Sequence, residues 1–193
     1  TRTYDRNSQA ANAVALYMEL TTSENRQQVF DNLIADIRRR NNALTAGDVG
    51  YRYVLRALEA GGASDVIYDM NCKYDTPGYG WQLAHGATAL TESWQAYGFV
   101  SNNHFMLGHL MEWLFSGLGG IRQKEDSFGF KHIVIKPEPV GDVRDAQVFY
   151  ESPYGQIVSD WKDNDKEFII RVEVPANSKA SIYLPSADTK QIT

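Results

Sequence analysis

The sequence has little cysteine, no long apolar run and no excess of basic residues, and each shortage excludes a class of protein. The single cysteine, Cys72, excludes an internal disulfide and a cysteine-cluster zinc site; we expect it to be a small buried thiol on a helix. No stretch reaches the roughly 18–20 apolar residues of a membrane span, so no membrane partner is expected. The 19 Lys and Arg residues are outnumbered by 24 Asp and Glu, and the net charge of −5 argues against a nucleic-acid surface.

The composition is otherwise that of a folded globular protein, with 43% hydrophobic and 12% aromatic residues. A chain of 193 residues is long enough for one or two domains with a substantial core. Helical spacing of apolar residues predicts helices at residues 7–20, 23–41, 48–60, 64–73, 87–97 and 102–118. The first four are expected to form two antiparallel pairs joined by short loops. In the first helix the predicted buried face is made by Ala10, Val14, Tyr17 and Met18.

After the last predicted helix the pattern changes to short alternating segments. Glycines between residues 117 and 130 break the helical pattern. Strands are then predicted at residues 131–136, 146–151, 156–161, 167–174 and 180–184, separated by turn residues. Short strands at such intervals are typical of an antiparallel β-sandwich. We expect Trp161 to pack in its core, the alternative being an exposed ring that binds sugar.

Residues 74–115 hold the densest mixture of aromatic rings, glycines, histidines and a carboxylate. Pro77, Gly78 and Gly80 indicate a turn with unusual backbone angles. Tyr79 and Trp81 flank the second of these glycines, as in a loop that presents flat rings to a ligand. This stretch is therefore the first place to look for a binding site.

Glu92 is the candidate catalytic carboxylate. On the helix predicted at residues 87–97 it shares a face with Thr88 and Gln95, away from the apolar stripe. A carboxylate among hydrogen-bonding side chains, just after an aromatic loop, suits hydrolysis of a sugar. The alternative is a solvated surface residue, because most Glu side chains on helices stay exposed.

Other polar residues have structural readings that compete with functional ones. Gln9 is either at the floor of a pocket or exposed in the first turn of its helix. The basic triplet at residues 38–40 favours a solvated helix C-terminus over an anion site. Asp48 is expected to cap the next helix and not to be a site acid. The histidines at positions 85, 104 and 109 follow no metal-ligand spacing, so no metal is expected.

Three segments, in order along the chain, resemble motifs of the inverting α-L-rhamnosidases. Residues 45–53 (Thr-Ala-Gly-Asp-Val-Gly-Tyr-Arg-Tyr) resemble the family's Thr-x-Gly-x-x-Gly-x-x-Tyr/Phe helix start. Residues 86–94 (Gly-Ala-Thr-Ala-Leu-Thr-Glu-Ser-Trp) resemble Gly-Ala-Thr-Thr-x-Trp-Glu-x-Trp, with Thr91 in place of the first Trp. Residues 101–108 (Ser-Asn-Asn-His-Phe-Met-Leu-Gly) resemble Ser-x-Asn-His-Tyr-x-x-Gly. Together these motifs extend the resemblance over roughly residues 1–185.

The resemblance implies a fold and a set of roles. It implies part of an (α/α)6 toroid of helical hairpins, predicted at residues 1–125, followed by the β-sandwich domain, predicted at residues 126–193. Glu92 would be the general base, and His104, with Asn103 beside it, would hold sugar hydroxyls. The rings of Tyr79, Trp81 and Trp94 would stack on the sugar or wall its pocket. The family's general acid lies in an acidic motif upstream, which nothing in this sequence matches.

The resulting expectation is part of a glycoside hydrolase that removes terminal α-L-rhamnose without a cofactor or metal. Its expected partners are rhamnoside substrates and the remainder of a longer polypeptide, since the chain starts at Thr1 without an initiator Met. Expressed alone, the chain is expected to self-associate through apolar faces. The resemblance implies a periplasmic or secreted enzyme. The alternatives are another toroidal glycosidase, of the glucosidase or trehalase kind, and a non-catalytic carbohydrate-binding fragment.

Overall fold

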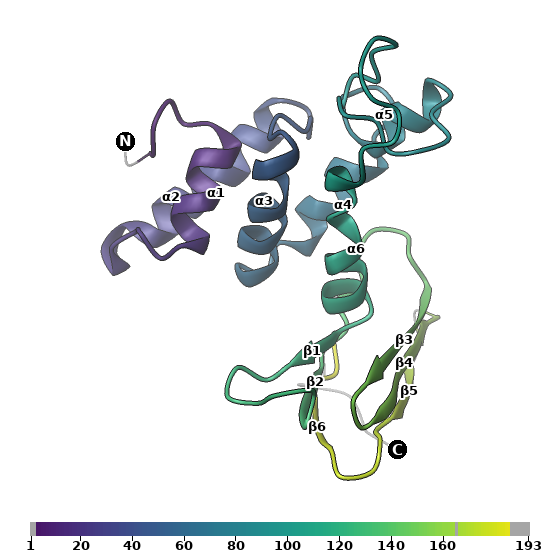
Figure 1. The fold of residues 1–193 in the computed structure, drawn as a ribbon. Coiled ribbons are helices and arrows are strands. Elements are labelled where there is room, and N and C mark those ends of the chain that lie inside the picture. Colours follow the sequence, from purple (N-terminus) through teal and green to yellow (C-terminus); the bar gives the residue numbers. More distant parts are fainter. Residues whose placement is uncertain (1–2, 165, 186–193) are drawn as a thin grey trace. The chain divides into compact units, whose positions relative to one another are not determined.

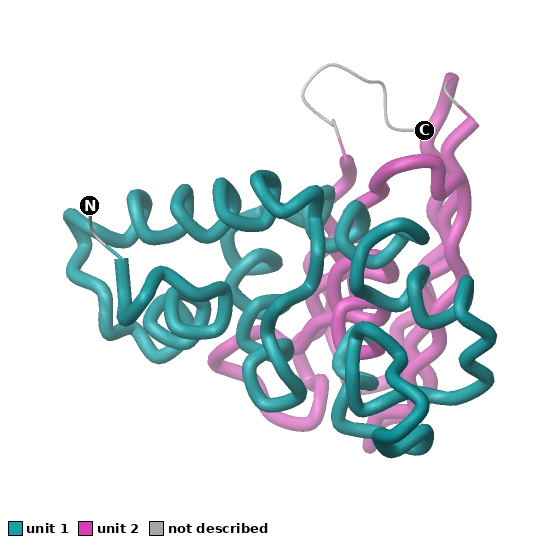
Figure 2. The backbone as a smooth tube through the Cα atoms, turned by 90° about the horizontal axis from the view of Figure 1, so that it is seen from above, with its two compact units in different colours: residues 1–110 teal, residues 111–193 magenta. Residues whose placement is uncertain are grey.

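The computed structural model describes residues 3–164 and 166–185, which form two compact units, residues 1–110 and 111–193 (Figures 1 and 2). The outer ends of the two predicted domains, residues 1–2 and 186–193, lie outside the described residues. The boundary predicted between residues 125 and 126 stays a prediction. A helical part followed by a part made of sheets is the predicted fold class, and it is confirmed.

The first unit is a set of helices joined by short loops (Figure 1). The helices are α1 (Gln9–Tyr17), α2 (Ser23–Arg39), α3 (Asp48–Ala60), α4 (Ser64–Cys72) and α5 (Tyr79–Ala84), followed by the 3-10 turn η1 (Phe105–Leu107). The α1 helix packs against α2 and α3, and α3 packs against α4 and η1. The first four predicted helices are therefore present, in the two predicted pairs.

The α3 helix provides the apolar centre of this unit. Its predicted stripe of Tyr51, Val54, Leu55 and Leu58 is buried, which confirms the periodicity argument. Hydrophobic residues of α2, which packs on α1, and of α4, which packs on α3, are equally buried, namely Val29, Leu33, Ile37, Val66, Ile67 and Met70. The Cys72 thiol at the end of α4 is exposed, so the prediction that it is buried is wrong.

The buried face of α1 differs from the predicted one. Tyr17 and Met18 are exposed, whereas Gln9 and Asn12 are fully buried. Gln9 can be buried because both ends of its amide are paired: Nε2 donates to the Ala43 carbonyl at 3.0 Å, and Oε1 accepts from the Thr45 amide at 3.1 Å. These bonds fix the loop that leads into α3, so Gln9 has the structural role left open by the sequence.

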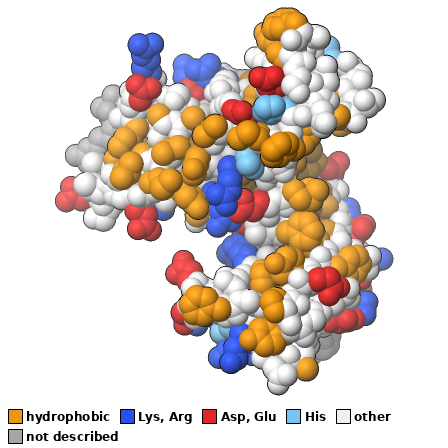
Figure 3. All heavy atoms as spheres, viewed as in Figure 1, with side chains coloured by type: hydrophobic (Ala, Val, Ile, Leu, Met, Phe, Trp, Pro, Cys, Tyr) orange, Lys and Arg blue, Asp and Glu red, His pale blue; other side chains and the backbone are white. Residues whose placement is uncertain are grey.

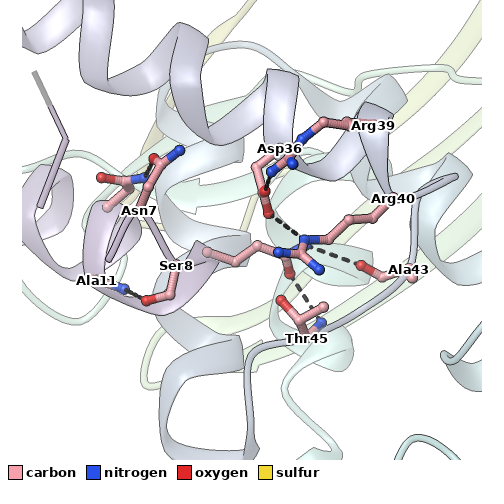
Figure 4. A network of polar contacts seen from close by, with 10 residues as sticks. Asn7, Ser8, Ala11, Asp36, Arg39, Arg40, Ala43 and Thr45 are labelled. Carbon is pink, nitrogen blue, oxygen red and sulfur yellow. Dashed lines mark hydrogen bonds and ion pairs between the residues drawn. The ribbon is translucent and has the colours of Figure 1, made fainter. Parts of the chain in front are cut away.

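A second polar network closes α2. The buried carboxylate of Asp36 pairs with Arg39 and, at 2.9 Å, with Arg40, as Figure 4 shows. Arg38 pairs with Asp65, at 3.0 Å, and with Asp69 of α4. The basic triplet is thus partly exposed and paired with carboxylates of its own chain, which accounts for it without an anion ligand.

Two predicted helices differ from those observed. Residues 87–97 form no helix: Gly86 takes a left-handed conformation (φ 80°), and the chain after it is irregular up to residue 104. Short polar side chains such as Thr91 and Ser93 bond to nearby backbone groups there, which competes with helix formation. Residues 102–118 become helical only from Phe105, as η1, α6 (Leu110–Trp113) and the π-helical turn η2 (Leu114–Leu118).

The second unit contains two three-stranded sheets. Their strands are β1 (Ile121–Gln123), β2 (His132–Ile135), β3 (Asp145–Ser152), β4 (Gly155–Asp163), β5 (Phe168–Glu173) and β6 (Lys179–Ile182). One sheet has the order β1-β2-β6 and the other β3-β4-β5. All neighbours are antiparallel except β2 and β6, which are parallel with His132 opposite Lys179. The predicted strands are thus present. The structure adds β1, which was not predicted because three residues are too few to show an alternating pattern.

The core of the second unit lies between the sheets. Ile121, Ile133 and Ile135 from one sheet pack with Ile157 from the other, as a β-sandwich requires. Trp161 of β4 is fully buried, and its indole donates to the Leu118 carbonyl at 2.9 Å. The prediction that Trp161 belongs to the core is confirmed.

Candidate functional site

The candidate site is built on residues 86–104, here called the site loop. Its two ends run side by side: the Glu92 amide donates to the Ser101 carbonyl at 2.8 Å, and the His104 amide donates to the Leu90 carbonyl at 2.8 Å. Glu92 and His104 therefore lie on neighbouring segments of one loop. The helix predicted at this position is wrong. The irregular loop nevertheless brings the second and third motifs together.

The side chain of Glu92 is exposed and directed by one backbone contact. Its Oε2 atom accepts a hydrogen bond from the Ser101 amide at 3.1 Å. This bond holds one carboxylate oxygen against the loop. No bond is recorded to the other oxygen among the described residues, so it is free to accept a proton from a ligand or from water.

Side chains of α5 hold the outer part of the site loop. Gln82 donates through Nε2 to the Ser93 carbonyl at 3.2 Å, and Trp81 donates through Nε1 to the Gln95 carbonyl at 3.2 Å. Thr91 is buried and donates its hydroxyl hydrogen to the Ser93 carbonyl at 2.6 Å. Because the loop is not helical, its carbonyls lack the backbone donors that a helix would provide, and these three bonds supply donors instead. They also fix the backbone on both sides of Glu92.

Trp94 anchors the site loop in the helical core. Its side chain is 5% exposed, and its indole donates to the Ala46 carbonyl at 2.7 Å. The ring meets those of Tyr51 and Tyr79 edge to face, with centroids 4.9 and 5.3 Å away. Of the two roles predicted for Trp94, its burial suits a wall behind the site and not a stacking surface.

Tyr51 and Tyr79 stay neutral in this aromatic cluster. Burial raises the pKa of Tyr51 far above its usual value, and burial likewise raises the pKa of Tyr79. The Tyr79 hydroxyl approaches the Tyr51 hydroxyl and the Leu110 backbone without completing a hydrogen bond of good geometry to either. Tyr79 begins α5 and is half-buried against Tyr51 and Trp94, so it does not project from an open turn.

The remaining predicted residues are Trp81 of α5 and Asn103 of the site loop. The Trp81 ring stacks on His85, with centroids 4.0 Å apart. Asn103 is exposed, and its amide donates to the Ser101 hydroxyl at 3.3 Å. Histidine and acidic side chains lie next to hydrophobic ones on the face of the first unit that Figure 3 displays, a combination that suits a ligand with hydroxyl groups and apolar faces.

Asp48 is the residue whose place sequence reasoning missed. It begins α3, and its Oδ2 lies 3.2 Å from Nε2 of His104, 56 residues further along the chain. The hydrogen bond from His104, followed by that from the Val49 amide, lowers the pKa of Asp48 below its usual value. The prediction that Asp48 caps α3 is wrong, because Gly47 is the N-cap residue and Asp48 is the first residue of the helix. Its position within the motif at residues 45–53 was the available signal for another role.

Among residues 3–164 and 166–185, no group of three His, Cys, Asp or Glu side chains is arranged to hold a metal ion. No helix within these ranges is long and apolar enough to cross a membrane. The chemistry that the site offers is therefore that of one exposed carboxylate, a carboxylate–histidine pair and aromatic rings.

Relatives with known sequences point in the same direction. An α-L-rhamnosidase from Streptomyces avermitilis is 28% identical over 188 residues, which cover 93% of this chain and 18% of that protein. An α-L-rhamnosidase from Formosa agariphila is 27% identical over 194 residues, covering 96% of this chain and 21% of that protein. The chain thus spans about a fifth of the length of the curated relatives that it matches.

The fold and the family models agree with this. The structure of α-L-rhamnosidase from Dictyoglumus thermophilum matches with a TM-score of 0.87 and 29% identity, over 95% of this chain and 21% of that chain. Residues 120–193 match the model of the bacterial α-L-rhamnosidase C-terminal domain. Residues 1–118 match that of the bacterial α-L-rhamnosidase six-hairpin glycosidase domain, so the chain belongs to the bacterial α-L-rhamnosidase family.

Proposed function

We propose that this chain is the catalytic-base part of a longer α-L-rhamnosidase, an enzyme that hydrolyses terminal α-L-rhamnosyl bonds with inversion. The observation that carries the proposal is the pairing of the two loop segments that bear Glu92 and His104, through two backbone hydrogen bonds. Family membership supports the reaction class, and a relative from Streptomyces avermitilis has been solved in complex with L-rhamnose, which supports the sugar.

Glu92 would act as the general base. Inverting glycosidases place two carboxyl groups roughly 6.5–9.5 Å apart, which leaves room for a water molecule between the base and the sugar. The Glu92 carboxylate takes one proton from this water, whose oxygen attacks the anomeric carbon from the face opposite the leaving group. As the glycosidic bond breaks, a second carboxylic acid gives its proton to the departing oxygen, so the products are free rhamnose and an alcohol.

That second acid would come from another part of the enzyme. A general acid needs a raised pKa so that it is protonated near neutral pH, whereas the pKa of Asp48 is lowered. Asp48 is therefore unsuited to this role. His104 and Asn103 would bind hydroxyl groups of the sugar, Trp81 and Tyr79 would contact or enclose its ring, and Trp94 would support them from behind.

The substitution Glu92→Gln in the full-length enzyme tests the proposal. The amide oxygen of Gln can still accept from the Ser101 amide, so we expect an unchanged fold, but it cannot take a proton from water. Turnover of 4-nitrophenyl α-L-rhamnoside should fall by at least about 100-fold, the lower end of general-base catalysis. Near-normal turnover would exclude Glu92 as the base.

Two further measurements complete this test. Glu125→Gln, the same change at an exposed position of the second unit, should leave turnover unaffected. The anomeric form of the first product, followed by NMR, should be inverted, and a retained product would contradict the mechanism. Activity against a panel of aryl glycosides checks the sugar, since a preference for glucosides would favour another toroidal glycosidase.

The location and the second unit belong to the same proposal. We propose a periplasmic or secreted enzyme, an inference from the resemblance alone that fractionation of the producing cells can check. The β-sandwich formed by strands β1 to β6 is proposed not to bind substrate, in keeping with its buried Trp161. Strong sugar binding by the sandwich, with no effect of Glu92→Gln on the enzyme, would favour the carbohydrate-binding alternative.

A further inference from the structure

We propose that Asp48 positions His104 for the sugar by fixing which ring nitrogen faces the ligand. The role rests on the proposed function, because it concerns the histidine that would bind a sugar hydroxyl. It depends on the contact between Asp48 and His104, which the motifs alone do not show. Asp48 occupies an unspecified position of the first motif, and His104 belongs to the third.

The Asp48 carboxylate is held at both oxygens. Oδ1 accepts from the Val49 amide at 2.9 Å, within the first turn of α3. Oδ2 lies 3.2 Å from Nε2 of His104. Because the pKa of Asp48 is lowered, the group is ionised near neutral pH and can only accept hydrogen bonds. Nε2 of His104 must then carry a proton and donate it to Asp48.

The backbone of His104 is also fixed by a hydrogen bond. Its amide bonds to the Leu90 carbonyl at 2.8 Å, which places the residue beside the Glu92 segment of the site loop. The side chain is 21% exposed, so part of the ring reaches solvent. With Nε2 committed to Asp48, the nitrogen left for a ligand is Nδ1, for which no hydrogen bond is recorded among the described residues. In the neutral ring Nδ1 is an acceptor and suits a sugar hydroxyl as donor.

A purely structural role for Asp48 makes a different prediction. A carboxylate in the first turn of a helix stabilises that helix through its dipole, with or without a histidine partner. Removing it would then lower stability regardless of residue 104. If Asp48 acts through His104, its removal matters for sugar binding only while the histidine is present, and this difference separates the two roles.

A double-mutant cycle in the full-length enzyme measures this difference, with Asp48→Ala, His104→Gln and both together. Asp48→Ala should raise the KM for 4-nitrophenyl α-L-rhamnoside about tenfold, the scale of a lost hydrogen bond to a charged group, while kcat changes less than about twofold. The dissociation constant of L-rhamnose, measured by calorimetry, should rise in parallel. In the His104→Gln background, the further change Asp48→Ala should alter KM by less than about twofold.

Two controls sharpen the result. Glu24→Ala removes an exposed first-turn carboxylate from α2 and should leave KM unchanged. Asp48→Glu retains a first-turn carboxylate and should recover part of the lost affinity only while His104 is present, whereas a gain in helix stability would be the same in the His104→Gln background. Equal and additive effects of Asp48→Ala with and without His104 would overturn the inference. A wild-type enzyme that neither binds L-rhamnose nor cleaves rhamnosides would instead overturn the proposed function.

Discussion

Trp94 and Trp81 each donate an indole hydrogen bond to a backbone carbonyl, but they do so in different surroundings. The bond from Trp94 to Ala46 is buried and 2.7 Å long, whereas the bond from Trp81 to Gln95 is exposed and 3.2 Å long. A buried carbonyl that loses its donor cannot turn to water, while an exposed one can. The same chemical change at the two positions should therefore have unequal costs.

Trp94→Phe keeps an aromatic ring in the core but removes the indole donor. It should destabilise the protein by about 1–3 kcal/mol, because the buried Ala46 carbonyl is left unpaired. Trp81→Phe is the matched control and should cost less than about 1 kcal/mol, since water can replace its bond. Both values come from denaturant unfolding of the full-length enzyme. Equal losses would show that the Trp94 bond does not anchor the site loop as argued.

The lowered pKa of Asp48 gives a second expectation at this scale. A carboxyl whose pKa is lower in the folded state stabilises the fold above its unfolded value of 3.8, and this contribution is lost as the pH falls through the folded value. Asp48→Asn should therefore lower the melting temperature between about pH 5 and 7, where the carboxylate is ionised, and lower it less below about pH 3. A difference in melting temperature that does not shrink on acidification would contradict the hydrogen bond between the ionised Asp48 carboxylate and His104.

At the scale of elements, α5 is the support on which the site loop is built. Its six residues, Tyr79–Ala84, supply the Trp81 and Gln82 side chains that bond to loop carbonyls. The helix begins where the chain passes very close to the end of α4. At Gly80 an added Cβ would lie 2.1 Å from the Lys73 carbonyl oxygen, so only glycine fits without a shift of the backbone.

Gly80→Ala should displace α5 and destabilise the protein by about 1–3 kcal/mol, the usual cost of overpacking against atoms that cannot move aside. Turnover should fall as well, because the bonds to Ser93 and Gln95 depend on the position of α5. Gly98→Ala serves as the control: it lies in the site loop, and its Cβ would meet no atom within 4 Å. Thermal unfolding and turnover of the two full-length variants provide the comparison, and a stable, active Gly80→Ala enzyme would refute this role of the glycine.

At the scale of the whole molecule, the chain spans about a fifth of the length of the relatives that it matches. The proposed mechanism requires two carboxyl groups, and only Glu92 on the described part of the chain has the position and exposure that we assign to one of them. Large apolar side chains are also exposed on the first unit, among them Leu20, Leu83 and Phe105. Both features suit a chain that functions as part of a larger enzyme.

The 193-residue chain expressed alone should therefore release no 4-nitrophenol from 4-nitrophenyl α-L-rhamnoside, and its exposed apolar surface should make it self-associate. Colorimetric assay and sedimentation analysis measure the two properties, with the full-length enzyme as reference. Hydrolysis by the isolated chain would show that the general acid lies within these residues. A purely monomeric chain would show that its apolar surface is not a contact face.

The sequence by itself determined the first four helices, the strands that follow β1 and much of the core, whereas α5 and β1 were not predicted. The stripe from Tyr51 to Leu58 and the alternation at residues 131–136 follow from periodicity, because burial of one face is decided locally along an element. The three motifs likewise identified the family. The helix predicted at residues 87–97 is wrong. Its apolar spacing and its Ala and Leu content fit a helical pattern, but side chains of α5 bond to the Ser93 and Gln95 carbonyls, which an irregular loop leaves open to them.

Only the tertiary structure decided how the candidate site is assembled. Asp48 and His104 are 56 residues apart, and the segments that carry Glu92 and His104 pair through two hydrogen bonds that no local pattern encodes. The burial of Gln9 and Trp94 has the same origin, since each bonds to a backbone carbonyl of the segment at residues 43–46. Periodicity reports which side of an element faces inward, but the partner of a polar group depends on which distant segment the fold brings to it.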